Sequence, residues 1–273
     1  MNNGYVVEGK TIELAKYDWD ILIILDACRY DYFSKINNID GVLKKAYTYA
    51  VCTPQYLKNN FDSLYKDIIY ISAMPHLNSK GIPIKYNNYV AKGKFFKIVD
   101  VWDWGFNPNL GTVHPKEVNK SAIPFINLYK NKRFVVHYAQ PHEPYLYYSG
   151  GPKENKGLNR HMKKIVKIHR FTQKYISNET LWRISNLFEK LPEKGKGKLW
   201  IKYGREGIIK GYEENLKEVL KYTKNLVDLY PKKKFLITAD HGELLGEKKR
   251  YGHFYEWEHP KLHYVPWLEL NND

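Results

Sequence analysis

The sequence predicts an α/β protein with a mostly parallel sheet and helices on both faces. Short runs rich in isoleucine and valine recur along the chain, which is the pattern of strands buried in a parallel sheet. Helix-like stretches separate these runs, so the expected order of elements is strand, helix, strand. The 273 residues suffice for one sizeable core, and they contain no run of about 18 apolar residues that could span a membrane.

Five apolar runs are predicted as strands, at residues 20–25, 67–71, 96–101, 133–138 and 234–238. The clearest helix is predicted over residues 212–230, because apolar side chains recur there at the i, i+3, i+4 spacing of one buried stripe and Pro231 follows. Residues 149–211 are rich in Gly, Lys and Asn and contain two helix-like pieces without a strand. We therefore expect a single domain over residues 1–273, with a helical insertion at about 149–211 that shapes the mouth of a site.

The charge balance indicates an anionic partner. Lysine and arginine total 44 against 29 acidic residues, a net charge of +15, which attracts phosphate- or sulfate-bearing molecules, glycans or lipid headgroups. Aromatic residues are frequent but lack an RNP-like or repeated arrangement, so an enzyme is favoured and no stable nucleic-acid partner is expected. A nucleic-acid binder that relies on charge is a third hypothesis, and it predicts a steep salt dependence of binding.

Cysteine content and the N-terminus bear on the cellular compartment. Cys28 and Cys52 are too few for a disulfide framework. The first residues lack the basic, apolar and small-residue regions of a signal peptide. We expect a cytoplasmic protein.

Polar side chains follow three of the predicted strands. Asp26 ends the first run, His142 follows the fourth, and Asp240 and His241 follow the fifth. Ligands of open α/β sheets bind beyond the carboxyl ends of the strands, where such groups can converge on a divalent metal. Each has a plainer explanation, since Asp26 can cap a helix and Asp240-His241 can form a turn. Their coincidence with a further histidine, His253, favours a site.

These residues resemble the sulfatase branch of the alkaline phosphatase superfamily. The order of the segments matches over nearly the whole chain, and Asp-His-Gly-Glu-Leu-Leu-Gly-Glu at 240–247 is the most specific of them. The segment Asp-Ala-Cys-Arg-Tyr-Asp at 26–31 is similar to archaeal sulfatase-like proteins. The resemblance implies an alkaline-phosphatase-like three-layer sandwich. The other matching segments are Cys52-Thr53-Pro54, Gln140-Pro141-His142-Glu143-Pro144-Tyr145 and Val265-Pro266-Trp267.

The resemblance also implies a metal site, with Asp26, Asp240 and His241 as ligands together with a nucleophile near Thr53. One ion is expected, because two-metal relatives carry a further Asp/His set and this chain has no aspartate between Asp103 and Asp228. Mixed carboxylate, hydroxyl and imidazole ligands favour zinc or manganese, with calcium as an alternative.

The nucleophile is predicted to be Thr53, with Cys52 as the alternative. Sulfatases carry Cys-x-Pro-x-Arg, in which the cysteine becomes formylglycine, but Tyr56 replaces the arginine here. Phosphoryl-transferring relatives use threonine or serine directly. Coordination to a divalent ion lowers the pKa of such a side chain and makes it a competent nucleophile. Alternatively, Thr53 only precedes Pro54 in a turn.

Three further residues are candidates for substrate contacts. His142 and His253 resemble histidines of phosphoethanolamine transferases and lipoteichoic acid synthases that contact the substrate anion or the leaving group. An imidazole can donate hydrogen bonds or a proton near neutral pH, so both are catalytic and substrate-binding candidates. Arg29 is a candidate clamp for an anionic oxygen, and pairing with a nearby acid explains it equally well.

The sequence thus predicts a metal-dependent hydrolase or transferase that cleaves a phosphate or sulfate ester through a covalent enzyme intermediate. The alternative is a catalytically degenerate relative that binds an anionic glycan or polyphosphate, which the altered Cys52-Thr53-Pro54-Gln55-Tyr56 segment motivates.

Overall fold

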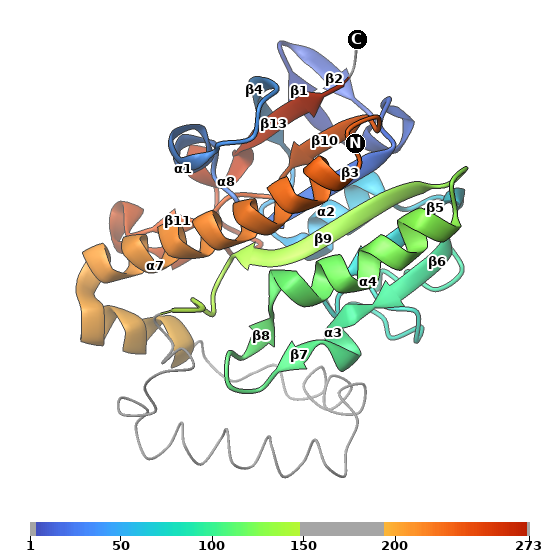
Figure 1. Ribbon diagram of the computed structural model, residues 1–273. Coiled ribbons are helices and arrows are strands. Elements are labelled where there is room, and N and C mark those ends of the chain that lie inside the picture. Colours follow the sequence, from blue (N-terminus) through green and yellow to red (C-terminus); the bar gives the residue numbers. More distant parts are fainter. Residues whose placement is uncertain (1–3, 148–193, 272–273) are drawn as a thin grey trace.

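A nine-stranded sheet runs through the molecule (Figure 1), in the order β2-β1-β4-β13-β10-β3-β9-β5-β6. The computed structural model describes residues 4–147 and 194–271. The strands of this sheet are β1 (Tyr5–Val7), β2 (Lys10–Ile12), β3 (Ile21–Asp26), β4 (Val42–Thr48), β5 (Tyr65–Ser72), β6 (Phe95–Asp100), β9 (Arg133–Pro141), β10 (Phe235–Thr238) and β13 (Tyr264–Leu270).

Two small hairpins and several helices complete the described part of the chain. The hairpins pair β7 (Phe106–Asn107) with β8 (Thr112–Val113) and β11 (Leu244–Leu245) with β12 (Tyr251–Gly252). The helices are α1 (Tyr30–Ile36), α2 (Thr53–Asn60), α3 (Val101–Trp104), α4 (Pro115–Leu128), α7 (Lys194–Leu229) and α8 (Pro260–His263), with short 3-10 turns η1 (Leu14–Lys16) and η2 (Glu247–Lys249).

The parallel half of the sheet confirms the predicted fold class. Strands β10, β3, β9, β5 and β6 are neighbours in parallel pairs, and they match the five predicted runs to within one residue at most ends. Ile21 to Leu25 of β3 are wholly buried, as a strand covered on both faces requires. The other half was not predicted: β13 is antiparallel to β10 and to β4, and β1 and β2 extend this edge.

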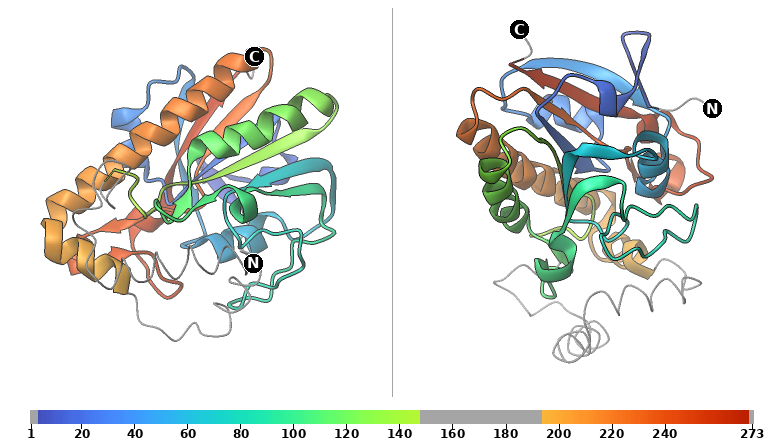
Figure 2. Two further views of the ribbon diagram at one scale, coloured as in Figure 1. Left: turned by 60° about the horizontal axis from the view of Figure 1, so that its bottom comes forward. Right: turned by 90° about the vertical axis from the view of Figure 1, so that its right-hand side faces the viewer.

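Helices cover both faces of the sheet and form three layers (Figures 1 and 2). Helices α7 and α4 lie on one face and α2 on the other. Successive side chains of a strand point to opposite faces of the sheet, so neighbouring residues of β9 should contact helices of different layers. The ring of His137 contacts Tyr56 of α2, whereas the hydroxyl of Tyr138 donates to Asn119 of α4. The expected three-layer sandwich is therefore confirmed.

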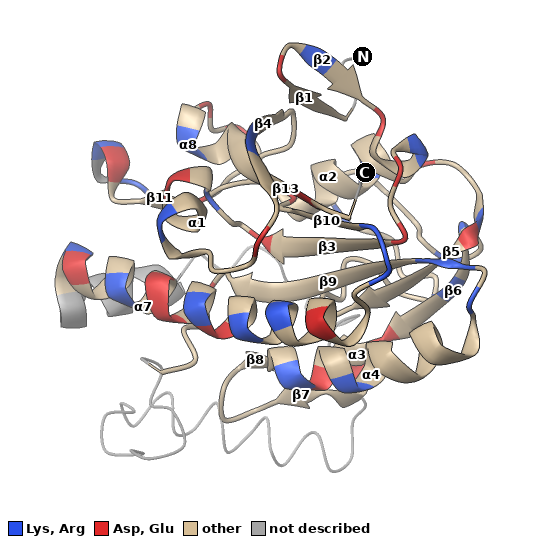
Figure 3. Ribbon diagram, turned by 45° about the horizontal axis from the view of Figure 1, so that its top comes forward, with Lys and Arg blue, Asp and Glu red and all other residues tan. Residues whose placement is uncertain are grey.

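Helix α7 is longer than predicted, because it begins at Lys194 and not near Tyr212. A kink at Gly204, whose φ is 64°, divides it. Its predicted apolar stripe is buried, and each of Leu216, Val219 and Leu220 contributes about 1.5–3 kcal/mol by leaving water. Charges of both signs alternate on its outer side (Figure 3).

The predicted helical insertion at 149–211 is described only where it overlaps α7. Residues 148–193, including both helix-like pieces, lie outside the described residues. Within residues 4–147 and 194–271, no helix combines the length and the apolar character that a membrane crossing needs.

Candidate active site

The carboxyl ends of two neighbouring strands bring the predicted metal ligands together. Asp26 is the last residue of β3, and Asp240 and His241 follow β10, the parallel neighbour of β3. All three side chains are at most 2% exposed. Nε2 of His241 lies 3.6 Å from Oδ1 of Asp26 and 3.3 Å from Oδ2 of Asp240. Groups that are 214 positions apart in the chain thus share one buried point.

The orientation of His241 suits a metal ligand. Its Nδ1 lies 2.8 Å from the carbonyl oxygen of Gly242, to which it donates in the neutral imidazole, so the lone pair of Nε2 faces the two carboxylates. Nε2 itself makes no hydrogen bond within the described part of the chain. Ligand atoms about 2.0–2.1 Å from a tetrahedral zinc ion are about 3.3–3.4 Å apart, close to the distances found here. The three residues therefore fit a divalent ion.

Gly242 permits this turn because no side chain fits at its position. A Cβ atom there would lie 2.0 Å from the carbonyl oxygen of Lys261, which real structures do not tolerate. The amide of Gly242 donates to the carbonyl of Leu262 at 2.7 Å and fixes the segment in place. Packing alone therefore requires a glycine in Asp-His-Gly, whatever the role of this segment in the chemistry.

Thr53 joins the cluster from the layer of α2, on the face of the sheet away from α4 and α7 (Figure 1). It is the first residue of α2 and is 3% exposed. Its hydroxyl donates to Oδ2 of Asp240 at 2.8 Å. The other carboxylate oxygen, Oδ1, accepts the amides of Ala27 and His241, each at 3.0 Å. The amide of Ala27 reaches it from a left-handed residue with a φ of 60°.

The electrostatics of Asp240 favour its charged form. Burial acts to raise its pKa, but the rings of His241 and His137 and the hydrogen bonds from Ala27 and Thr53 outweigh it, so the pKa is lowered. An ionised Asp240 can hold both a cation and the Thr53 hydroxyl.

Cys52 is less suited than Thr53 to be the nucleophile. Burial, with contributions from Asp240 and Asp26, raises the pKa of the thiol to about 11, so the thiol stays protonated near pH 7. Tyr56, at the position of the sulfatase arginine, is wholly buried against Tyr5. It therefore cannot provide the anion contact of an arginine at the site.

His142 and His253 lie beside the buried cluster. Their rings are 5.0 Å apart between centroids, and the rings of His253 and His241 are 4.1 Å apart. Glu243 completes this second group, with its Oε2 3.8 Å from Nε2 of His142. The side chain of His142 is 22% exposed, so this group forms the outer part of the site.

Helix α7 holds two of the loops that form the site. The hydroxyl of Tyr212 donates to the carbonyl of Ala27 at 2.8 Å and accepts the amide of Arg29 at 2.9 Å. The side-chain amide of Asn215 lies 3.0 Å from the carbonyl of His142, and its oxygen accepts the amide of Leu146 at 2.8 Å. The helix thus ties the loop after β3 to the loop after β9.

Comparison with solved structures finds this arrangement of elements in known proteins. The chain is similar to the soluble domain of lipooligosaccharide phosphoethanolamine transferase A from Neisseria meningitidis, with 12% identity, a TM-score of 0.53, and coverage of 99% of this chain and 81% of that domain. It is also similar to the integral membrane protein, with 13% identity and a TM-score of 0.50, where 98% of this chain spans 50% of that protein.

A protein in the alkaline phosphatase superfamily from Vibrio parahaemolyticus has 14% identity and a TM-score of 0.46, with coverage of 93% of this chain and 60% of that chain. The chain has the fold of the Neisseria transferase domain. At 12–13% identity the similarity concerns the fold alone and not the reaction. Neither a scan against protein-family models nor a search of curated proteins finds a match.

Within this fold, the guanidinium of Arg29 is occupied by acidic side chains of the protein and is not available as a substrate clamp. Its side chain is 3% exposed and donates to both oxygens of Asp31, at 2.9 and 2.7 Å. It also donates to Glu247 at 2.8 Å and to the carbonyl of Glu243 at 3.2 Å. Two carboxylates therefore neutralise the guanidinium, and the alternative of pairing with nearby acids is the one observed.

We expect Arg29→Met to destabilise the fold by about 2 kcal/mol, discounted because the Asp31 carboxylate is partly exposed. Burial acts to raise the pKa of Asp31, but Arg29 and Lys261 lower it to about 2. The contribution of Asp31 to stability is therefore complete above its usual pKa of about 3.9 and is lost as the pH falls toward 2. Denaturant melts at pH 7 and pH 2.5 measure both effects.

The exposed partner Lys261 provides the control, since Lys261→Met should cost at most about 1 kcal/mol. If Arg29→Met kept its stability but bound inorganic phosphate more weakly, the hypothesis that Arg29 binds the substrate anion would be supported instead.

Sequence reasoning missed two histidines near Asp240, of which His137 is wholly buried and His76 is partly buried. Nδ1 of His137 lies 2.9 Å from the hydroxyl of Tyr70, and its Nε2 lies 3.9 Å from Oδ2 of Asp240. His76 interacts electrostatically with His137 and Asp240. Burial lowers the pKa of both imidazoles to about 4, so both are neutral near pH 7. The position of His137 within a predicted strand, near its carboxyl end, was the available signal.

Proposed function

We propose that this chain is a metal-dependent enzyme that cleaves a phosphate or sulfate ester, with Thr53 as the nucleophile. The observation that supports it most is the 2.8 Å hydrogen bond from the Thr53 hydroxyl to Asp240, beside Asp26 and His241. The hydroxyl thus contacts one carboxylate of a cluster that contains two carboxylates and an imidazole. A threonine whose role was merely to precede Pro54 in a turn would not need this hydrogen bond to Asp240.

The chain's own residues account for both halves of the reaction. Oγ1 of Thr53 would attack the phosphorus or sulfur atom, and its proton would pass to Oδ2 of Asp240, its hydrogen-bond acceptor. The new ester bond to Thr53 forms as the bond to the leaving oxygen breaks. His142 or His253, in protonated form, would give a proton to the leaving oxygen from the outer part of the site. Water or an acceptor alcohol then releases the group from Thr53.

Asp26, Asp240, His241 and Thr53 would hold the divalent ion. When bound, it supplies positive charge that lowers the pKa of a hydroxyl and neutralises the oxygens of the attacked group. Carboxylate and imidazole ligands together suit zinc or manganese better than calcium.

The substrate would be an anionic small molecule, glycan or lipid headgroup. A net charge of +15 supports this, since it raises the local concentration of anions. The similar Neisseria protein is a phosphoethanolamine transferase, which supports transfer of a phosphate-containing group. A cytoplasmic location stays a prediction from the sequence, because the similar full-length protein is an integral membrane protein.

The proposal is tested with nitrophenyl phosphate, a nitrophenyl phosphodiester and nitrophenyl sulfate. We expect one of the three to be cleaved, the activity to fall below about 1% after chelation, and zinc or manganese to restore it. Activity that survives complete chelation would contradict the proposal. Tight binding of polyphosphate without cleavage of any substrate, at full metal occupancy, would instead support the degenerate alternative.

A further inference from the structure

We propose that the amino ends of the parallel strands form a surface that docks on an anionic membrane. Strands β10, β9, β5 and β6 run in one direction, so the segments that lead into them lie at one end of the sheet. The candidate active site lies at the other end, because Asp26, Asp240 and His241 stand at the carboxyl ends of β3 and β10. The inference therefore goes beyond the proposed function and does not depend on it.

An exposed apolar side chain stands at the entrance of each of these four strands. Leu64 directly precedes β5, Phe96 is the second residue of β6, and Leu128 and Leu229 are the last residues of α4 and α7, which precede β9 and β10. All four residues are at least 46% exposed. Single apolar residues are normal on a protein surface, whereas several at one end of a molecule indicate a binding surface.

A lysine accompanies each of these apolar residues. Three of the lysines lie two or three positions after a leucine, and Nζ of the fourth, Lys132, lies 4.2 Å from the ring centre of Phe96. None of the four forms an ion pair with a carboxylate of residues 4–147 or 194–271. We call the following eight residues the docking surface: Leu64, Lys66, Phe96, Leu128, Lys130, Lys132, Leu229 and Lys232.

Contacts between the entrances make the docking surface continuous. Nζ of Lys132 donates to the carbonyl of Lys66 at 3.1 Å, which joins the segments before β9 and β5. The hydroxyl of Tyr230 donates to Oδ1 of Asn127 at 3.0 Å, which joins the ends of α7 and α4. Figure 3 shows Lys and Arg on the segments that lead into β10 and β9.

Other cations at this end of the sheet are already neutralised by aspartates. The net positive charge of the docking surface therefore comes from its own four lysines, which remain available to an anionic partner. The neutralised pairs are Arg133 with Asp67, Lys233 with Asp20 and Lys234 with Asp18.

An anionic bilayer matches both kinds of side chain. Exposed apolar groups enter the boundary between headgroups and acyl chains, and lysines beside them are attracted by anionic headgroups. A nucleic acid would use the lysines through its phosphates but would leave the three leucines in water. The alternation of leucine and lysine at successive strand entrances therefore favours a membrane.

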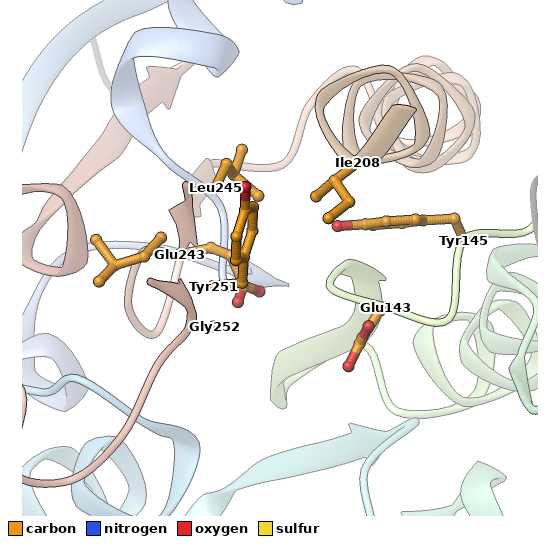
Figure 4. A pocket seen from close by; sticks show the side chains of 8 residues that line it. Glu143, Tyr145, Ile208, Glu243, Leu245, Tyr251 and Gly252 are labelled. Atoms are coloured by element: carbon orange, nitrogen blue, oxygen red, sulfur yellow. The ribbon is translucent and has the colours of Figure 1, made fainter. Parts of the chain in front are cut away.

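The opposite end of the sheet is unsuited to an anionic surface. A cavity of about 230 Å³, partly open to solvent, adjoins the outer histidines there, and its lining includes Glu143 and Glu243 (Figure 4). Carboxylates at this end disfavour contact with anionic headgroups. A molecule docked by the amino ends of its strands would keep this cavity open to the solution, and its substrate would arrive from the aqueous phase.

Flotation with lipid vesicles tests the proposal. Full-length protein is mixed with vesicles of phosphatidylcholine, either alone or with about 30% of the anionic lipid phosphatidylglycerol, at about 0.1 M salt. We expect binding to the anionic vesicles to be at least about tenfold stronger and to weaken at high salt, because each lysine near the membrane adds to the attraction.

Two double variants separate the contributions of charge and apolar contact. Lys130→Gln with Lys232→Gln, and Leu128→Ser with Leu229→Ser, should each weaken vesicle binding at least about tenfold. All four positions are exposed, so the fold should persist in both variants, which circular dichroism checks.

The matched control is Lys116→Gln with Lys210→Gln. It removes the same charge from exposed positions earlier in α4 and α7. Both positions lie about 18 Å or more along the helix from its last residue, beyond the Debye length of about 10 Å at about 0.1 M salt. Vesicle binding should change less than about twofold.

Several results would overturn the proposal. No preference for anionic vesicles, or unchanged vesicle binding in either double variant, would reject the docking surface. Binding of single-stranded DNA in place of vesicles, lost only in the lysine variant, would assign the surface to a nucleic acid. A dimer that the leucine variant alone converts to a monomer, without vesicle binding, would assign it to a second copy of the chain. Cleavage of soluble nitrophenyl substrates should be unchanged in both variants, so a failure of docking and a failure of the proposed function are separate results.

Discussion

Thr53→Ala is expected to lower ester cleavage by a factor of about 10³ to 10⁶, the range that removal of a nucleophile causes in other enzymes. The change removes the hydroxyl, one of the four proposed ligands, and a methyl group, whereas Asp26, Asp240 and His241 remain, so zinc should bind more weakly but still saturate the site. Initial rates with the substrate identified in the nitrophenyl series, at saturating zinc, measure the loss. Circular dichroism checks that the overall secondary structure is unchanged.

Two variants serve as controls for Thr53. Thr53→Ser keeps the hydroxyl and should retain measurable cleavage with a trapped phospho- or sulfo-serine. Cys52→Ala should keep full activity, because the buried thiol is protonated near pH 7. Unchanged activity of Thr53→Ala would eliminate Thr53, and a large loss in Cys52→Ala would point to the cysteine instead.

Asp240→Asn is expected to remove the metal and with it the activity, each by at least about 100-fold. The amide can still accept the backbone amides of Ala27 and His241 through Oδ1, so the loop is expected to persist. The negative charge is lost, however, and the amide nitrogen now faces the Thr53 hydroxyl, which donates to Oδ2 in the unchanged protein. Zinc calorimetry and initial rates measure the two losses.

Asp100→Asn is the matched control for Asp240. Asp100 is 4% exposed, lies at the end of the parallel strand β6, and accepts hydrogen bonds from the amide and hydroxyl of Ser79. Its replacement should lower stability without altering zinc binding. A loss of zinc in both variants would show that destabilisation, and not ligation, is responsible.

The parallel strands could be predicted because each is an uninterrupted apolar run buried on both faces. The antiparallel edge could not. Strand β4 carries Lys44 and Lys45 and is partly exposed, and β13 contains Pro266, which argues against a strand within a sheet. Their pairing, with Pro266 opposite Lys45, is decided by tertiary packing that no local pattern records.

The candidate site likewise has residues that the sequence could predict and residues that it could not. Asp26, Asp240 and His241 could be found because they directly follow apolar runs, where a sheet places its ligands. The position of Glu243 opposite His253 depends on the register of β11 and β12, and strands of two residues leave no recognisable pattern in a sequence. Arg29 was open to two interpretations because its burial depends on Glu247, 218 positions away.

The hydrogen bonds of Tyr212 and Asn215 have a mechanical consequence for the candidate site. One helix carries the anchors of both loops, so a displacement of α7 would move the backbone beside Asp26 and the backbone of His142 together. Both loops would then shift relative to Asp240 and His241, which follow β10, in a single step.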